Sequence, residues 1–166
     1  MSVPYLSCLS PSGGTFSAII APAEDLQQAL SILMKRDTGL LLYLCGNYPR
    51  LLPGLGEFSD RFEVRRALTA FQILTILEEA HHSCLVFEHD RSLYEERADL
   101  LPIIGQRCRE FAAANAGVFL IAEHPDRYIQ ALEPFVDRLY YIRQTAPRSS
   151  PQIRAQVSRQ QTLAGV

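Results

Sequence analysis

Lysine is nearly absent from this chain, because 15 of its 16 basic residues are arginine and only Lys35 is lysine. Chemistry that needs a lysine, such as a pyridoxal Schiff base or the phosphate-binding lysine of a P-loop, must use Lys35 or do without it. Three other signatures are also missing: the sequence has no G-x-G-x-x-G, no H-E-x-x-H and no G-x-S-x-G. No motif therefore assigns this chain to the dinucleotide-binding proteins, the zinc proteases or the serine hydrolases.

Long apolar runs are missing too. No stretch of about 18 apolar residues occurs, so no membrane span is expected. The first 22 residues carry no charged side chain and so lack the basic start of a signal peptide. The four cysteines lie too far apart for a C-x-x-C zinc or redox motif; they are Cys8, Cys45, Cys84 and Cys108. We expect reduced thiols and a cytoplasmic location.

What is present is an ordinary globular composition. The chain has 166 residues, of which 48% are hydrophobic and 20% are charged. This size and composition predict one domain with a substantial core, over residues 1–143. A net charge of −2 gives no overall attraction to nucleic acid.

Residues 144–166 have a different character from the rest of the chain. Together with Arg143, this segment holds glutamine, serine, alanine and proline, four arginines and no acidic residue. We predict a basic, polar C-terminal tail, with a short helix over 152–161 as an alternative. Its arginines leave open a role in binding nucleic acid.

Short apolar runs alternate along the chain with apolar residues at helical spacing. The runs predict strands over 16–20, 40–45, 83–87, 117–122 and 138–142, and the stripes predict helices over 25–36, 61–80, 99–115 and 128–132. Uniformly apolar strands that alternate with helices are typical of a parallel sheet covered on both faces. We therefore predict an α/β three-layer sandwich with a five-stranded, mainly parallel sheet, whose ligands would bind at the carboxyl ends of the strands.

The longest predicted helix, over 61–80, depends on one stripe of apolar residues. Its expected N-cap is Ser59 or Asp60, and the stripe consists of Val64, Leu68, Phe71, Leu74 and Leu77.

The connection after the first predicted strand is where doubly wound proteins usually hold phosphate. A Walker A loop there reads G-x-x-x-x-G-K-[ST], and its backbone amides surround the anion. This chain has no glycine, lysine or hydroxyl at that place, which reads Ala21, Pro22, Ala23, Glu24 and Asp25. Two carboxylates in the first turn of a helix repel the phosphate that its free amides would attract. We expect no ATP or Mg²⁺ at this position, and we predict no cofactor.

Several segments resemble the core of RecA/KaiC-like ATPases. The run GGTFSAIIAP (13–22) is similar to the entry into their P-loop, and CLVFE (84–88) resembles their Walker B strand, with Glu88 in place of the usual aspartate. Residues 117–122 and 136–142 resemble the following strand and the closing strand. The resemblance implies a RecA-like order of elements, as in small archaeal KaiC-like domains that have lost the P-loop. It also implies association into a homodimer or ring.

Two strand ends carry similar polar triplets. In a RecA-like order the strands that end in Glu88, His89 and Asp90 and in Glu123 and His124 are neighbours. Imidazoles with a carboxylate can hold zinc, manganese or iron, or can perform acid–base catalysis. Adjacent strand residues point to opposite faces, so only part of each triplet can converge. These five residues are the candidate catalytic residues, and no metal ligand set is assigned.

Besides the nucleic-acid role of the tail, three functions remain open from the sequence. The first is a non-catalytic RecA/KaiC-like domain that regulates or binds a protein partner or a second copy of itself. The second is a metal-assisted hydrolase built on the strand-end Glu-His clusters, and the third is an ATPase with an unusual nucleotide site. Tyr48 and Arg50, which follow the second predicted strand, are of the residue types that anchor protein interfaces.

Overall fold

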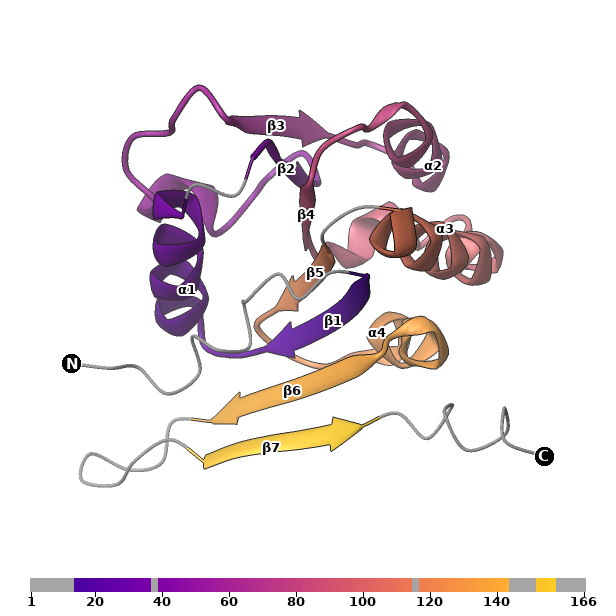
Figure 1. Ribbon diagram of the computed structural model, residues 1–166. Helices are drawn as coiled ribbons and strands as arrows, with labels where there is room; N and C mark the ends of the chain where they lie inside the picture. Colours follow the sequence, from indigo (N-terminus) through magenta and orange to yellow (C-terminus); the bar gives the residue numbers. More distant parts are fainter. Residues whose placement is uncertain (1–13, 37–38, 115–116, 144–151, 158–166) are drawn as a thin grey trace.

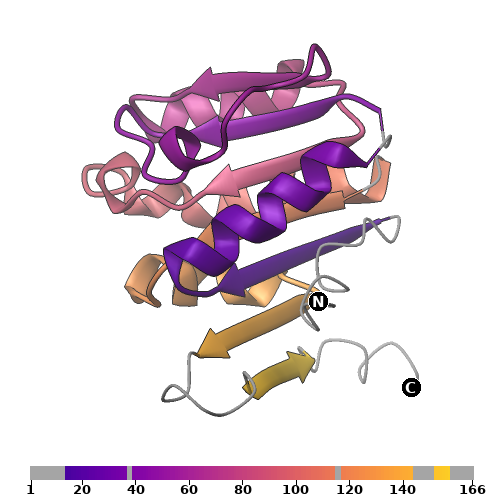
Figure 2. The same cartoon turned by 90° about the vertical axis from the view of Figure 1, so that its left-hand side faces the viewer.

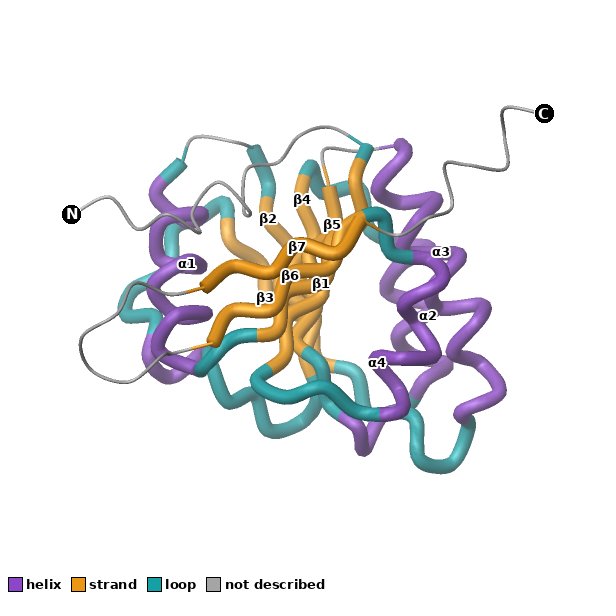
Figure 3. The backbone as a smooth tube through the Cα atoms, turned by 90° about the horizontal axis from the view of Figure 1, so that it is seen from below, coloured by secondary structure: helices purple, strands orange, loops and turns teal. Residues whose placement is uncertain are grey.

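A single twisted sheet runs through the middle of the molecule, and helices cover both of its faces (Figures 1 and 3). This computed structural model describes residues 14–36, 39–114, 117–143 and 152–157 of the chain. The strands are β1 (Thr15–Ile20), β2 (Leu41–Cys45), β3 (Phe62–Arg66), β4 (Cys84–Glu88), β5 (Gly117–Ala122), β6 (Arg138–Arg143) and β7 (Gln152–Val157). The main helices are α1 (Ala23–Lys35), α2 (Ala70–Glu79), α3 (Leu101–Ala114) and α4 (Arg127–Leu132).

The strand order is β3-β2-β4-β5-β1-β6-β7. Strands β1 to β6 pair in parallel, and β7 pairs antiparallel with β6. Figure 2 shows that the parallel strands end at the same edge of the sheet, while β7 runs the opposite way. The mainly parallel α/β sheet is confirmed, but it has six parallel strands instead of five, with β7 as a seventh strand.

The two faces of the sheet carry separate cores. Helix α1 packs its buried leucines on one face, against Tyr43 and Val86. Helices α2, α3 and α4 cover the other face, which includes Phe87 and Tyr94 (Figure 3). The central strands are buried along almost their whole length and are mostly apolar, because both of their faces are covered. Over the described part of the chain, no helix combines the length and the apolar character that a membrane span requires.

The predicted helix over 61–80 is wrong in its first half. Residues Phe62–Arg66 form the edge strand β3, and α2 begins only at Ala70. The cap is Thr69, whose hydroxyl accepts a hydrogen bond from Gln72 N–H, and not Ser59 or Asp60. β3 pairs with β2 and is partly exposed, so its sequence FEVRR mixes charged and apolar residues. It therefore lacks the apolar run by which the other strands were predicted.

The alternative of a helix over 152–161 is also wrong for the residues that the structure describes. Residues Gln152–Val157 form strand β7, in which Ile153 lies opposite Ile142 of β6. The remaining residues of the predicted tail, 144–151 and 158–166, lie outside the described part of the chain. The other predicted strands and helices are present. Most of their ends differ from the predicted bounds by one or two residues, and the others agree.

Candidate functional site

A cavity of about 530 Å³ opens at the carboxyl ends of β2, β4 and β5. It is lined by residues 46–51 after β2, 88–92 at the end of β4, and 121–126 at the end of β5. This is the edge at which parallel α/β sheets bind ligands. The predicted neighbourhood of the two polar strand ends is confirmed, because Glu88 of β4 lies opposite Ile121 of β5.

Glu88 ends β4 on the face that α1 covers. Only 6% of its surface is exposed. One carboxylate oxygen accepts a hydrogen bond from Tyr43 Oη at 2.5 Å, and the other accepts one from Arg50 N–H at 2.7 Å. Burial raises the pKa of Glu88, although the bonds from Tyr43 and from the backbone of Arg50 and Leu51 act in the opposite direction. The carboxylate thereby ties the loop after β2 to the end of β4.

This raised pKa predicts a pH dependence of stability. The folded state holds the Glu88 proton more tightly than the unfolded chain does, so wild-type stability falls as the pH rises above about 4.5 through the folded-state pKa. Glu88→Gln cannot ionise and lacks this loss. We expect its stability relative to wild type to increase between pH 4.5 and pH 8, by at most about 1.4 kcal/mol per pH unit, in urea denaturation.

The matched control for this measurement is Glu78→Gln, because Glu78 is an exposed carboxylate on α2. Its stability relative to wild type should be the same at both pH values. Parallel pH profiles for wild type and Glu88→Gln would show that Glu88 does not have a raised pKa in the folded protein.

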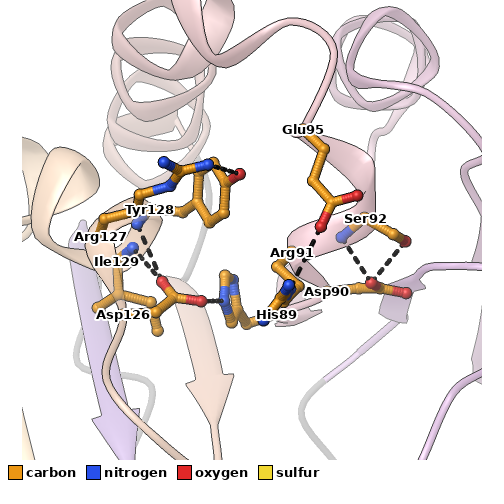
Figure 4. A network of polar contacts seen from close by, with 9 residues as sticks. All are labelled: His89, Asp90, Arg91, Ser92, Glu95, Asp126, Arg127, Tyr128 and Ile129. Atoms are coloured by element: carbon orange, nitrogen blue, oxygen red, sulfur yellow. Dashed lines mark hydrogen bonds and ion pairs between the residues drawn. The ribbon is translucent and has the colours of Figure 1, made fainter.

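His89 lies on the opposite face of the sheet from Glu88, where its ring stacks on Tyr94 at a centroid distance of 5.8 Å. Its Nε2 lies 2.6 Å from Asp126 Oδ2 (Figure 4). The other oxygen of Asp126 accepts hydrogen bonds from the N–H groups of Tyr128 and Ile129 and so caps α4. Burial raises the pKa of Asp126, but the bonds from Ile129 and His89 outweigh it and lower the pKa. The Asp126 carboxylate therefore joins the end of β4 to the start of α4.

The remaining candidate residues have separate roles. Asp90 Oδ1 accepts hydrogen bonds from both the N–H and the hydroxyl of Ser92. Glu123 faces Arg50 at 3.4 Å, and His124 is exposed. Among the described residues, no three histidine, cysteine, aspartate or glutamate side chains lie close enough to hold a metal ion. The structure brings the two strand ends together, but it points Glu88 and His89 to opposite faces and does not assemble a metal centre from them.

The connection from β1 to α1 contains only Ala21 and Pro22. Glu24 is exposed in the first turn of α1, whereas Asp25 is buried. None of residues 21–25 lines the cavity described above. The predicted phosphate position adjoins the cavity, however, because Ala21 N–H donates a hydrogen bond to the carbonyl oxygen of Ala122, which lines it.

Three residues of the site were not among the candidates predicted from the sequence: Tyr43, Tyr94 and Asp126. Tyr43 lies inside an apolar run, which gives no signal that its hydroxyl donates to a carboxylate. Tyr94 lies in a charged segment, which gives no signal that its ring is buried against His89. Asp126 did carry one signal, because an aspartate directly before a helix is a preferred N-cap. Nothing in the local sequence indicates that its second oxygen binds His89.

The chain has a RecA-like α/β fold. Its structure superposes on the flagellar accessory protein FlaH from Methanocaldococcus jannaschii with a TM-score of 0.55, over 88% of this chain and 78% of that one, at 11% sequence identity. At this identity the likeness concerns the fold alone. No known protein-family profile matches the sequence.

A relative by sequence is also archaeal. An uncharacterized protein of Archaeoglobus fulgidus is 35% identical over 83 residues, which make up 50% of this chain and 41% of that protein. The match spans less than half of the relative's length.

Proposed function

We propose that this chain is a RecA-like domain that does not hydrolyse ATP and acts as a regulatory or protein-interaction module. The observation that carries the proposal is the two-residue connection between β1 and α1. A Walker A motif needs eight residues with two glycines, a lysine and a hydroxyl residue, and its amides must curve around the phosphates. Ala21 and Pro22 offer neither the length nor the glycines for such a loop.

The charges near this connection support the same proposal. Glu24 and Asp25 lie in the first turn of α1, where they oppose the binding of a polyphosphate. Lys35, the single lysine of the chain, is the last residue of α1. A helix rises 1.5 Å per residue, so Lys35 is about 18 Å along the helix from Ala23.

The state of Glu88 is a third argument. The resemblance to RecA/KaiC-like ATPases puts Glu88 at the end of the Walker B-like strand, where an acidic side chain would serve the nucleotide's metal ion. Here both of its oxygens already accept hydrogen bonds, from Tyr43 and from Arg50 N–H. A carboxylate that is buried and fully bonded in this way serves to hold the structure together.

Calorimetric titration of the protein with ATP and Mg²⁺ tests the proposal. We expect no binding in the micromolar range, because the two-residue connection between β1 and α1 offers no array of backbone amides to replace the hydration of the phosphates. Micromolar binding, or turnover of ATP that is lost on mutating Glu88, would overturn the assignment in favour of an ATPase with an unusual nucleotide site.

Glu24→Gln is the matched variant for this titration. If the absent loop is the main obstacle, removing one exposed negative charge should not restore binding. A gain of micromolar affinity in Glu24→Gln would instead show that charge repulsion alone excludes the nucleotide.

A further inference from the structure

We propose that the cavity at the ends of β2, β4 and β5 binds a cationic side chain, a guanidinium or an alkylammonium group, of a partner protein. The inference rests on the proposed function, since it names the surface that an interaction module would use and the chemistry that it would recognise. It is carried by the charges, the unpaired acceptor atoms and the exposed aromatic residue around one cavity.

The cavity has an excess of negative charge. Besides the buried Glu88, three carboxylates line it, those of Asp90, Glu123 and Asp126, against two guanidinium groups, those of Arg50 and Arg91. Arg91 already pairs with Glu95 on its own turn at 3.3 Å, and Arg50 pairs with Glu123 at 3.4 Å (Figure 4 shows the first pair). The two arginine side chains are 75% and 78% exposed, so neither is held inside the cavity. A cation entering the cavity therefore meets carboxylates in excess.

Two carboxylates of the lining each have an oxygen without a hydrogen bond among the described residues. Asp90 accepts both of its bonds on Oδ1, and its Oδ2 has no hydrogen bond from the described residues. Glu123 uses only Oε2, for its weak bond to Arg50. Groups with several N–H donors, such as a guanidinium or an ammonium, complement such a surface.

His89 is the most telling of these acceptors, because its side chain is only 8% exposed and its Nδ1 has no partner among the described residues. A carboxylate oxygen only accepts, so Nε2 of His89 donates to Asp126, and in a neutral ring this is the one N–H group. Nδ1 then carries a lone pair. A buried acceptor without a donor is costly, and a ligand N–H that reached it would remove that cost.

The rim of the cavity carries an exposed aromatic ring. Tyr48 is 84% exposed, the largest exposed fraction among the large hydrophobic side chains described. Two residues further on, the backbone of its loop is fixed by the bond from Arg50 N–H to Glu88. A tyrosine ring beside carboxylates attracts a cation through its π face, and a rigid loop spares the entropy of ordering it.

The dimensions favour a side chain over a bare ion. Among the described residues no group of three ligands can hold a metal, whereas about 530 Å³ is in the range of cavities that accept organic groups. The cavity is open at the edge of the sheet, where a partner's backbone can remain outside while its side chain enters.

The probe is the capped tripeptide acetyl-Gly-Arg-Gly-amide, titrated into ¹⁵N-labelled protein and followed by amide chemical shifts. We expect saturable shifts in residues 46–51, 88–92 and 121–126. The same peptide with citrulline in place of arginine keeps the shape but loses the charge, and should bind at least tenfold more weakly. Equal affinity for the two peptides, or shifts confined to other parts of the protein, would overturn the proposal.

The variant for this test combines Asp90→Asn with Glu123→Gln, which removes two charges but keeps a side-chain oxygen at position 90 to cap the Ser92 turn. We expect at least a tenfold loss of affinity for the arginine peptide. The control is Glu110→Gln, an exposed carboxylate on α3 that should leave the affinity unchanged. Unchanged affinity in the double variant would exclude this cavity as the cation site.

Two further titrations complete the test. One distinguishes a partner protein from a free polyamine as the source of the cation, and the other distinguishes the cation site from the non-ATPase assignment. Spermidine that binds with the same shifts and higher affinity than the peptide would show a free polyamine site and overturn the commitment to a partner protein. The titration with ATP is followed at the amides of residues 23–25, none of which lines the cavity. Failure of the peptide to bind and failure of the non-ATPase assignment would therefore appear as separate results.

Discussion

Asp126→Ala is expected to lower the free energy of unfolding by about 2–4 kcal/mol. The change removes the N-cap of α4, which typically costs about 0.5–2 kcal/mol. It also leaves the buried Nε2 of His89 without its partner, which costs about 1–3 kcal/mol more. Urea denaturation of the two proteins measures the difference, and hydrogen exchange of α4 amides should show faster opening in the variant.

Asp126→Asn is the matched control, because asparagine is an equally good N-cap and its amide can donate to Nε2 of His89 in the tautomer that carries the ring proton on Nδ1. We expect less than half of the loss seen with alanine. If asparagine and alanine destabilise the protein equally, the contribution of Asp126 comes from its charge and not from these hydrogen bonds.

Gly105→Ala is expected to destabilise the protein by about 1–3 kcal/mol, although alanine is the better helix former by about 1 kcal/mol. Gly105 is buried in the middle of α3, and a Cβ there would overlap the Phe135 ring, with Phe135 Cγ only 2.7 Å away. The atoms involved are at the root of the ring, so a small rotation cannot relieve the contact. Urea denaturation measures this loss.

The Phe135→Ala background isolates the contact. Once the ring is absent, Gly105→Ala should be neutral or stabilising by up to about 1 kcal/mol, as helix propensity alone predicts. An equal loss in both backgrounds would mean that Phe135 is not what excludes a side chain from position 105. The difference between the two backgrounds is the coupling energy of the pair.

The central part of the fold could be predicted from the sequence because its strands are buried on both faces. β5 is GVFLIA and β4 is CLVFE, and their apolar character follows from the helices on either side. The helix α3 was similarly evident from its stripe, since Ile104, Cys108 and Phe111 all face the core.

The edges of the sheet could not be predicted in the same way. β3 has one neighbouring strand and partly exposed residues, so its charged side chains imitate a helical surface. A signal that was available is the sequence TAFQ (69–72), in which a threonine followed three residues later by glutamine marks a helix start. β7 forms only by pairing with β6, and this pairing depends on the tertiary structure more than on local composition.

The sequence predicted that the two polar strand ends are neighbours, but it did not predict the contacts of their side chains. The position of Glu88, His89, Asp90 and Glu123 at one edge follows from strand order. That Glu88 would bind Tyr43, and that His89 would bind Asp126, depends on which face of the sheet each side chain meets. Glu88 is 45 residues from Tyr43 in the sequence, and His89 is 37 residues from Asp126. No spacing pattern in a single sequence predicts contacts between residues so far apart.

The position of β1 within the sheet has a consequence for how the chain folds. Both neighbours of this strand come late in the sequence, since Thr15 lies beside Gly117 and Ser17 beside Arg138. During synthesis, β1 leaves the ribosome about 100 residues before β5 and about 120 before β6, so it would wait for most of the described domain before it could pair. Contacts so distant along the chain are associated with slow folding, and an apolar strand that waits unpaired is a natural client for a chaperone.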